Sequence, residues 1–378
     1  MDSSQKLTNT DVKKLNKNRI FRLIYNSDKI SRQEIADQLG LSLPTVNQNL
    51  KMLMEDGLIE YVGNFTSTGG RRAQAITINN NARKAISVNI KADYINVDVV
   101  GLKGQIIYSM AVKAHFSKSS AYIEKLTDAV RHAVDYVGAD ADDILGVGVT
   151  VPGILDDEKQ ILISAPPLKA KNYDFIRLIS AIDYPVVVMN DARAEAYADH
   201  WFNGKPEDEK IYIMLGEGVG GAYINASAIR NGVHNRGGEF GHMVIHPGGK
   251  QCLCGKKGCF EAYVSEKVLS SELDMTLDNF FELAAQGNKN NSNVLDEYMD
   301  NLALGINNIY TMMDCDIVLG GTVAPYLKQY DNSIKERLVN DYSFDTDADY
   351  LRISDGGGRK SGLGAALSFV ARFIDGVE

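Results

Sequence analysis

Residues 238–261 read Gly238-Glu-Phe-Gly-His242-Met-Val-Ile-His246-Pro-Gly-Gly-Lys-Gln-Cys252-Leu-Cys254-Gly-Lys-Lys-Gly-Cys259-Phe-Glu261, and they hold three of the four cysteines of the chain. Thiolates bind Zn²⁺ at about 2.3 Å and imidazole nitrogens at about 2.0 Å, and four such ligands complete a tetrahedron. The glycines at 255 and 258 allow a short loop to fold back on one ion, because glycine reaches backbone angles closed to other residues. The spacing therefore predicts a zinc site formed by Cys252, Cys254, Cys259 and one histidine, either His242 or His246.

The composition is that of a soluble globular protein with more than one domain. The chain has 378 residues, of which 44% are hydrophobic and 24% charged, and this length exceeds one ordinary core. The sequence shows neither a membrane-spanning run of about 18 apolar residues nor the apolar segment of a signal peptide. Once the cluster is assigned to a metal, Cys315 has no disulfide partner, which fits a reducing compartment. We therefore expect a cytoplasmic protein without membrane contacts.

Charge is distributed unevenly along the chain. The net charge is −9, but residues 1–75 carry 11 lysines and arginines against 8 acidic residues, so this segment is positive by 3 and the remainder negative by 12. A polyanion such as DNA is attracted by positive charge. Only the N-terminal segment is therefore expected to bind nucleic acid.

The N-terminal segment has the pattern of three short helices. Apolar residues recur at helical spacing over 12–26, and Ser31 with Glu34 forms a capping box that opens a helix ending at Gly40. Ser42 caps a third helix, in which Pro44 is tolerated in the first turn. The apolar residues of this third helix lie on one stripe, so the opposite face presents Thr45, Gln48 and Lys51. This arrangement predicts a helix-turn-helix whose second helix enters the major groove of double-stranded DNA.

Two strands, over 58–62 and 75–78, follow this unit and enclose a polar loop that contains Arg71 and Arg72. Two guanidinium groups beside a glycine pair can enter a minor groove or clamp phosphates. The alternative is a trihelical unit that serves only as an interaction module. The basic loop favours a winged helix-turn-helix, with Thr45, Gln48, Lys51, Arg71 and Arg72 as DNA-binding residues.

Strand and helix patterns alternate in the remainder of the chain. Residues 85–100 and 105–112 read as two strands joined through the turn 101–104, a helix is expected over 120–137, and further strands over 145–151, 185–189 and 211–215. This order predicts an α/β protein with mixed sheets. Four motifs follow predicted strands, where open α/β sheets place ligand sites: Val151-Pro-Gly153, Asn190-Asp191, Gly216-Glu-Gly-Val-Gly-Gly221 and Gly320-Gly321.

The sequence combines four features: the motif Gly238-Glu239-x-x-His242, the cysteine cluster followed by Glu261, the pair Asn190-Asp191 and the loop at Gly216. In this combination it closely resembles the ROK family of repressors, open reading frames and sugar kinases. The resemblance covers about residues 83–378. The winged helix-turn-helix in front resembles the repressor branch of the family, which holds xylose-type and N-acetylglucosamine-type regulators.

The resemblance implies a two-lobed, actin-like sugar kinase fold, related to ribonuclease H, with a sugar in the cleft. It implies a DNA-binding domain over 1–80, a first lobe over 83–190 completed by a C-terminal helix at 361–378, and a second lobe over 191–360 with its zinc loop at 242–261. It selects His242 as the fourth metal ligand. It also implies that the sugar is bound by the matching positions Gly153, Asn190, Asp191, Glu239, His242 and Glu261.

The phosphate-binding loop departs from the family's kinases. Their motif Asp-x-Gly-Gly-Thr is replaced here by Asn89-Ile-Lys91-Ala92-Asp93. Side chains in place of glycines would obstruct the backbone approach to phosphate, and we expect the Asp93 carboxylate to repel a triphosphate. Asp191 matches the general base of the kinases, so on this reading it is vestigial and no residue is catalytic.

The sequence therefore predicts a sugar-responsive transcriptional regulator, most simply a repressor of carbohydrate-utilisation genes. It would bind one structural zinc ion per chain, operator DNA and a monosaccharide or sugar phosphate, and it would act as a homodimer or a dimer of dimers. The sequence also admits two alternatives. One is an active sugar kinase with an appended DNA-binding domain, and the other is a binding platform whose effector is a protein.

Overall fold

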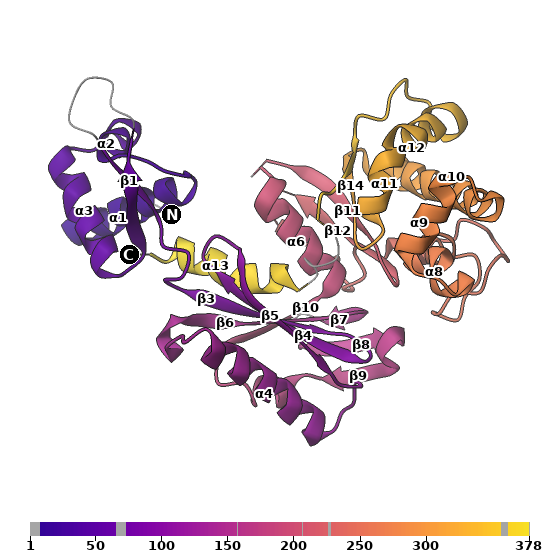
Figure 1. Ribbon diagram of the computed structural model, residues 1–378, viewed down its shortest axis with the longest axis horizontal. Helices are drawn as coiled ribbons and strands as arrows, with labels where there is room; N and C mark the ends of the chain where they lie inside the picture. Colours follow the sequence, from indigo (N-terminus) through magenta and orange to yellow (C-terminus); the bar gives the residue numbers. More distant parts are fainter. Residues whose placement is uncertain are drawn as a thin grey trace, which may run out of the picture.

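The computed structural model describes residues 8–65, 73–156, 158–205, 207–225, 228–356 and 362–377. Figure 1 shows three parts: an N-terminal unit at the left, a first lobe at the bottom and a second lobe at the right. The two chain ends lie near one another beside the N-terminal unit.

The N-terminal unit is a winged helix-turn-helix, as predicted. Its elements are α1 (Asn9–Tyr25), α2 (Arg32–Leu39), α3 (Leu43–Glu55), β1 (Ile59–Asn64) and β2 (Gln74–Ile78). Ser31 and Glu34 form the predicted capping box of α2, and Gly40 ends this helix in the left-handed conformation. Ser42 caps α3 by accepting a hydrogen bond from the backbone N–H of Thr45.

The first lobe is built on a mixed five-stranded sheet with the strand order β10-β6-β3-β4-β5. The antiparallel strands are β3 (Lys84–Ile90), β4 (Tyr94–Gly101) and β5 (Ile106–Lys113), and β6 (Ile144–Val151) and β10 (Val186–Asn190) run parallel to β3. The prediction of a single strand over 85–100 is wrong, because the chain turns at residues 91–93. Each apolar half of that stretch is long enough to form its own strand, so apolar pattern alone did not reveal the turn.

Helices cover both faces of this sheet. In Figure 1 the helix α4 (Ser120–Tyr136) lies on one face and α13 (Leu363–Asp375) lies on the other. A smaller sheet and the short helix α5 (Ile176–Ile179) extend the lobe, and the strands of that sheet are β7 (Ile154–Asp156), β8 (Ile161–Ala165) and β9 (Ala170–Asp174).

The second lobe repeats the strand pattern of the first. Its sheet has the order β13-β12-β11-β14-β15, with three antiparallel strands followed by two strands parallel to β11. The strands are β11 (Glu209–Leu215), β12 (Val219–Asn225), β13 (Ala228–Arg230), β14 (Asp316–Gly320) and β15 (Leu351–Ile353). Its helices are α7 (Glu261–Val264), α8 (Glu266–Leu269), α9 (Leu277–Ala285), α10 (Lys289–Met313), α11 (Ala324–Leu327) and α12 (Asp331–Arg337). The predicted class, an α/β protein with mixed sheets behind a winged helix-turn-helix, is confirmed.

Two helices join the three parts of the molecule. The helix α6 (Asp191–Asn203) begins where β10 ends and packs against α13. At the far end of α6, the ring of Trp201 lies 6.2 Å from that of Tyr25 in α1. Helix α13 meets α1 as well, since the rings of Phe21 and Phe373 lie 6.3 Å apart and Asn18 Nδ2 donates to the carbonyl oxygen of Ile374 at 2.8 Å. The winged helix-turn-helix therefore shares one apolar core with α6 and α13.

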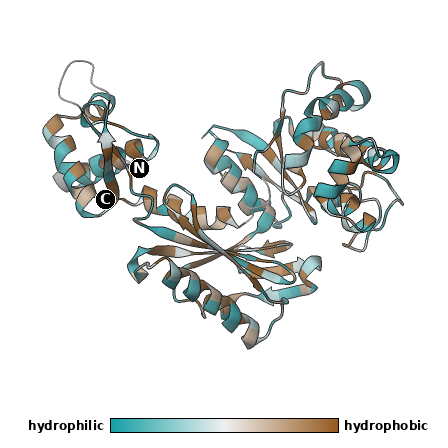
Figure 2. Ribbon diagram, in the orientation of Figure 1, coloured by the Kyte–Doolittle hydropathy of each residue, from teal (hydrophilic) through white to brown (hydrophobic). Residues whose placement is uncertain are grey.

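Hydropathy follows this arrangement. Figure 2 shows apolar residues concentrated in the strands of both lobes and on α13, while α4 carries polar residues on its outer side. None of the helices that the structure describes is both long and apolar enough to span a membrane.

The crossing of α6 and α13 depends on a glycine. A Cβ built on Gly364 overlaps the backbone of Ala194. We predict that Gly364→Ala lowers the free energy of unfolding by about 1–3 kcal/mol, because overpacking forces two buried helices apart. Urea unfolding followed by circular dichroism measures this change. Gly376→Ala in the same region is the milder comparison, since the nearest atom to its built Cβ is 3.3 Å away and does not overlap it, so the loss of stability should be much smaller. Equal stability of the two variants would contradict the prediction.

Candidate functional site

A cleft of about 340 Å³ lies between the two lobes at the carboxyl ends of their strands. The four strand-end motifs all contribute lining residues, including Gly153, Asn190, Gly216 and Gly321. Because the two sheets have the same strand order, the ends of equivalent strands face one another across this space. The six positions that the resemblance implied for sugar binding line this cleft together: Gly153, Asn190, Asp191, Glu239, His242 and Glu261.

A cluster of metal-ligand side chains forms part of the rim. The ligand atoms of His242, Cys252, Cys254 and Cys259 all lie within 4.8 Å of one another. Cys254 Sγ is 3.7 Å from Cys259 Sγ, and Cys252 Sγ is 3.8 Å from His242 Nδ1. Sulfur atoms at about 2.3 Å from one tetrahedral ion would be about 3.8 Å apart, so the four residues fit a metal ion.

The loop geometry explains why these residues meet. Gly255 and Gly258 both have positive φ, and a Cβ on Gly258 would overlap the carbonyl oxygen of His246. His246 lies outside the cluster, because its Nε2 is 2.6 Å from Asn301 Oδ1. The structure thus decides the choice between the two histidines in favour of His242.

His242 and Glu261 connect the cluster to the cleft. Nδ1 of His242 faces Cys252, and its Nε2 lies 3.8 Å from Glu239 Oε2. Glu261 Oε1 lies 3.6 Å from Cys252 Sγ, while its Oε2 accepts the backbone N–H of Val219 at 3.0 Å. Burial raises the pKa of Glu239, although His242 and Arg193 act in the opposite direction. A metal held by Nδ1 would therefore fix the imidazole with Nε2 directed toward the cleft.

Asn190 and Asp191 are positioned by the start of α6. The Asn190 side chain accepts from the backbone N–H of Arg193 and donates to the carbonyl oxygen of Gly153 at 2.8 Å. Asp191 Oδ1 accepts the backbone N–H of Ala192 at 3.0 Å. The carboxylate is thus held at the N-terminus of a helix, where the backbone dipole favours negative charge.

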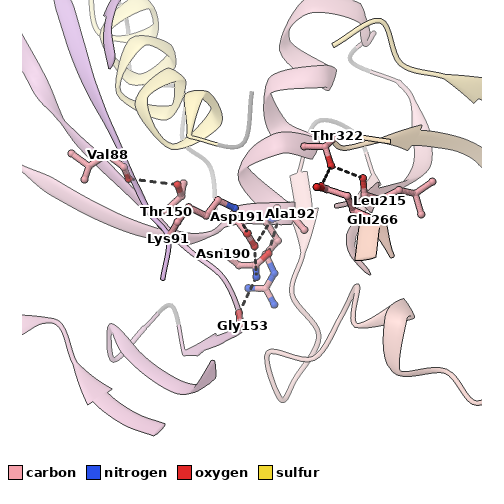
Figure 3. Close-up of polar contacts among 11 residues, drawn as sticks. Val88, Lys91, Thr150, Gly153, Asn190, Asp191, Ala192, Leu215, Glu266 and Thr322 are labelled. Carbon is pink, nitrogen blue, oxygen red and sulfur yellow. Dashed lines mark hydrogen bonds and ion pairs between the residues drawn. The ribbon is translucent and has the colours of Figure 1, made fainter. Parts of the chain in front are cut away.

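Lys91 enters the cleft at the position of a phosphate-loop glycine. Its Nζ lies 3.5 Å from Asp191 Oδ2, and Figure 3 shows the two side chains meeting. Burial alone would lower the pKa of Lys91, but Asp191 and Glu217 outweigh this and raise it. The expectation for Asp93 is wrong, because this residue is not among those that line the cleft and its carboxylate pairs with His115 Nδ1 at 2.8 Å on the surface.

Glu195 is a buried carboxyl group that sequence reasoning missed. It lies one helical turn after Asp191, so the spacing of four residues could have placed it on the same face. Its Oε1 accepts hydrogen bonds from Tyr212 Oη at 3.0 Å and from the backbone N–H of Gly321 at 2.8 Å. Burial raises the pKa of Glu195 to about 7, although these two donors act in the opposite direction. The backbone N–H of Gly321, in the glycine motif after β14, is therefore already bonded to a side chain of the protein.

Sequence reasoning also missed a contact between two other residues of the cleft. Thr322 Oγ1 donates to Glu266 Oε2 at 2.5 Å, as Figure 3 shows. Both residues line the cleft, as does Glu217 of the glycine loop.

The predicted DNA-binding residues of α3 lie on its outer face. Gln48 and Lys51 are exposed and Thr45 is partly exposed, whereas Val46, Leu50 and Leu53 are buried. Asn47 is also exposed there, and its Oδ1 accepts a weak hydrogen bond from Arg32 at 3.4 Å. Arg71 and Arg72 lie outside the described residues.

These features define a class of protein: two lobes of repeated topology with a polar cleft and a metal-ligand cluster at its rim, behind a winged helix-turn-helix. The ROK family model matches residues 85–370, and a winged helix-turn-helix DNA-binding model matches residues 15–60. The chain belongs to the ROK family.

Curated relatives include named repressors. The xylose repressor of Bacillus subtilis strain 168 is 29% identical over 322 residues, which cover 82% of each chain. The DNA-binding transcriptional dual regulator NagC of Escherichia coli K12 is 26% identical over 69% of this chain and 65% of its own length.

Solved structures with this fold include both regulators and kinases. A ROK family transcriptional regulator, a homologue of the E. coli MLC protein, superposes with a TM-score of 0.73 at 20% identity and covers 97% of this chain and 100% of its own. A ROK family glucokinase from Streptomyces griseus, in complex with glucose and AMPPNP, gives a TM-score of 0.62 at 25% identity, covering 75% of this chain and 98% of its own. The fold alone therefore does not separate a regulator from a kinase.

Removal of one thiolate should release the metal. We predict that Cys259→Ser lowers the metal content from about one ion per chain to a small fraction of that, since a tetrahedral site needs its four ligands. Plasma mass spectrometry of freshly purified protein measures the ratio. Cys315→Ser, which lies outside the cluster, should keep the metal. A full metal content in the Cys259 variant would contradict the assignment.

Glu195 should make stability depend on pH. Its pKa rises from 4.5 to about 7 on folding, so the native carboxyl keeps a proton that the unfolded chain loses between these values. This stabilisation is lost as the pH rises through that window. Glu195→Gln has no proton to lose, so the stability of the wild type relative to the variant should fall by about 3 kcal/mol between pH 4.5 and 8.

Urea unfolding of both proteins at a series of pH values measures this difference. Glu272→Gln, at an exposed position, is the control and should follow the wild-type profile. Parallel profiles for the wild type and the Glu195 variant would show that the buried carboxyl does not titrate in this way.

Proposed function

We propose that this protein is a sugar-responsive transcriptional regulator, most simply a repressor of carbohydrate-utilisation genes, that binds its effector without phosphorylating it. One observation carries the proposal: α6 begins in the cleft at Asp191 and ends at the apolar core of the winged helix-turn-helix. Relatives named xylose repressor and N-acetylglucosamine repressor support the same assignment.

In this proposal the chain has three functional parts. Residues 1–80 bind operator DNA, residues 83–190 form the first lobe together with the C-terminal helix at 361–378, and residues 191–360 form the second lobe. The sugar occupies the cleft, where carboxylates and amides pair with its hydroxyl groups. A site of this kind rejects the wrong epimer because buried polar groups are then left unpaired.

The metal in the proposal is a structural zinc ion held by His242, Cys252, Cys254 and Cys259. Three thiolates and one imidazole suit Zn²⁺, and they leave no open position for chemistry on the ion. The function of the ion is to hold the loop 242–261 so that His242 and Glu261 face the cleft.

In this proposal the protein does not transfer a phosphoryl group, because side chains replace the glycines of the phosphate loop. Lys91 and Ala92 occupy the glycine positions of the phosphate loop, so backbone N–H groups there are screened from a phosphate. Lys91 also pairs with Asp191, the position of the general base in the kinases. One oxygen of this carboxylate therefore already faces an ammonium group of the protein.

The proposed switch transmits cleft closure to the DNA-binding unit through α6 and α13. Sugar binding draws the lobes together, α6 moves with them, and the packing of Trp201 and Phe373 on α1 turns the winged helix-turn-helix. In a homodimer the two recognition helices must reach half-sites about one helical turn apart, so a small rotation abolishes simultaneous contact. To shift the ratio of closed to open conformations from 1:99 to 99:1, the sugar must bind the closed conformation more tightly by about 5.5 kcal/mol. Several polar contacts can supply this difference.

DNA reading is assigned to Thr45, Gln48 and Lys51 on α3, with Arg71 and Arg72 of the wing. Amide and hydroxyl groups match base edges in the major groove, and the ammonium matches phosphate. Asn47 joins this set because it is exposed on the same helix.

A pair of variants should separate DNA binding from sugar binding. We predict that Gln48→Ala weakens operator binding by about 1–3 kcal/mol, the usual cost of losing a bidentate contact to a base, while the sugar-induced thermal shift stays. Glu239→Gln should have the opposite profile, with normal DNA affinity and no release of DNA by sugar. Fluorescence anisotropy with labelled operator and scanning fluorimetry with a sugar panel give both readouts. A panel without any stabilising sugar would favour a protein effector instead.

The chief alternative is an active sugar kinase with an appended DNA-binding domain, which the presence of Asp191 at the position of the general base favours. A coupled assay for ADP formation with the effector sugar distinguishes the two. Turnover at ordinary kinase rates, about 1–100 per second, would refute the proposal that the protein does not phosphorylate its effector.

A further inference from the structure

The charges around the cleft are strongly unbalanced. The described residues that line it include two lysines and six carboxylic acids, namely Lys91, Lys267, Asp191, Glu195, Glu217, Glu239, Glu261 and Glu266. Glu195 is partly protonated near neutral pH because its pKa is about 7. His242 adds no positive charge when a metal holds its ring. Carboxylates therefore exceed cations even when Glu195 is neutral.

Lys91 lies beside Asp191, the position of the general base in the kinases, and its ammonium is already paired. Its Nζ lies 3.5 Å from Asp191 Oδ2, and the side chain of Asp191 is only 7% exposed. Glu217, which belongs to the glycine loop of the second lobe, also acts on Lys91 electrostatically. Carboxylates on both sides of the cleft thus offset the positive potential of the Lys91 ammonium. The attraction between Lys91 and an anionic ligand is correspondingly weak.

We propose that the effector is an uncharged, unphosphorylated sugar, and that the Lys91–Asp191 ion pair is the feature that excludes phosphorylated and acidic sugars. The inference rests on the proposed sugar-binding function and narrows it to one chemical class. A neutral hydroxyl can donate to Asp191 and accept from Lys91 while the ion pair remains intact.

A phosphate group would have to break this pair. It carries a charge of about −1.5 to −2 at neutral pH, so it competes with Asp191 for Lys91 and leaves a buried carboxylate without its partner. Removing one partner of a buried pair is strongly unfavourable. The excess carboxylates add repulsion at short range in a site of reduced dielectric. Together these effects should weaken binding of a sugar phosphate by at least about a hundredfold relative to the free sugar.

Matched pairs of ligands test the proposal on the full-length, metal-bound protein. Isothermal titration calorimetry at pH 7.5 compares D-glucose with glucose 6-phosphate, N-acetylglucosamine with its 6-phosphate, and D-xylose with xylose 5-phosphate, and D-glucuronate provides a carboxylate. We expect the neutral member of at least one pair to bind and its charged partners to bind at least about a hundredfold more weakly. Tighter or equal binding of a phosphorylated member would overturn the inference while leaving the sugar-responsive function in place. Absence of binding by every ligand would remove the proposed function and the inference with it.

Two variants identify the cause of the discrimination. Asp191→Asn releases Lys91 from its pair, so the ratio of phosphate to neutral affinity should rise by at least about tenfold even if both affinities fall. Glu217→Gln removes one carboxylate outside the proposed sugar-binding set, and it should raise the same ratio while the affinity for the neutral sugar changes less than about twofold. If the ion pair had only a structural role, each variant would change the affinities for the neutral and the phosphorylated sugar by the same factor. An unchanged affinity ratio in both variants would therefore refute the role of the ion pair.

Discussion

The close crossing of α6 and α13 is the constraint on which the rest of the structure depends. Gly364 allows α13 to reach the backbone of Ala194, and this contact places α13 against α6 and against the sheet of the first lobe. The remaining surface of α13 then receives α1 of the winged helix-turn-helix. One apolar core therefore joins a DNA-binding unit to the helix whose first residue, Asp191, lines the cleft.

The repeated strand order of the two lobes explains the chemistry of the cleft. Each sheet ends its parallel strands at the same edge, so the motifs after β6, β10, β11 and β14 face a common space. In a kinase of this fold, the nucleotide half of such a space needs glycines and free backbone donors. Here the cleft is lined by polar groups that already have partners within the protein: Lys91 pairs with Asp191, Glu195 accepts from Gly321, and Glu266 accepts from Thr322.

The sequence was most informative where local chemistry decides the structure. A capping box predicted α2, an N-cap serine and an apolar stripe predicted α3, and the cysteine spacing predicted a cluster that the structure brings within ligand distance. The turn at 91–93 was missed, because it lacks glycine and proline and lies between two apolar stretches. The directions of Lys91 and Asp93 could not be predicted either, since they depend on which side chain finds a partner: Lys91 meets Asp191, which is 100 residues away, and Asp93 meets His115. Glu195 was overlooked although its spacing from Asp191 was visible, because its burial depends on Tyr212 and Gly321 from the second lobe.

The position of α13 in the chain has a consequence for biosynthesis. Helix α13 is made long after α1, yet it supplies the surface on which α1 packs. During translation the winged helix-turn-helix leaves the ribosome long before its docking surface exists. A chain interrupted before residue 363 would hold α3 of the winged helix-turn-helix but lack the helix on which α1 packs, so the orientation of this unit is fixed only after α13 has been made.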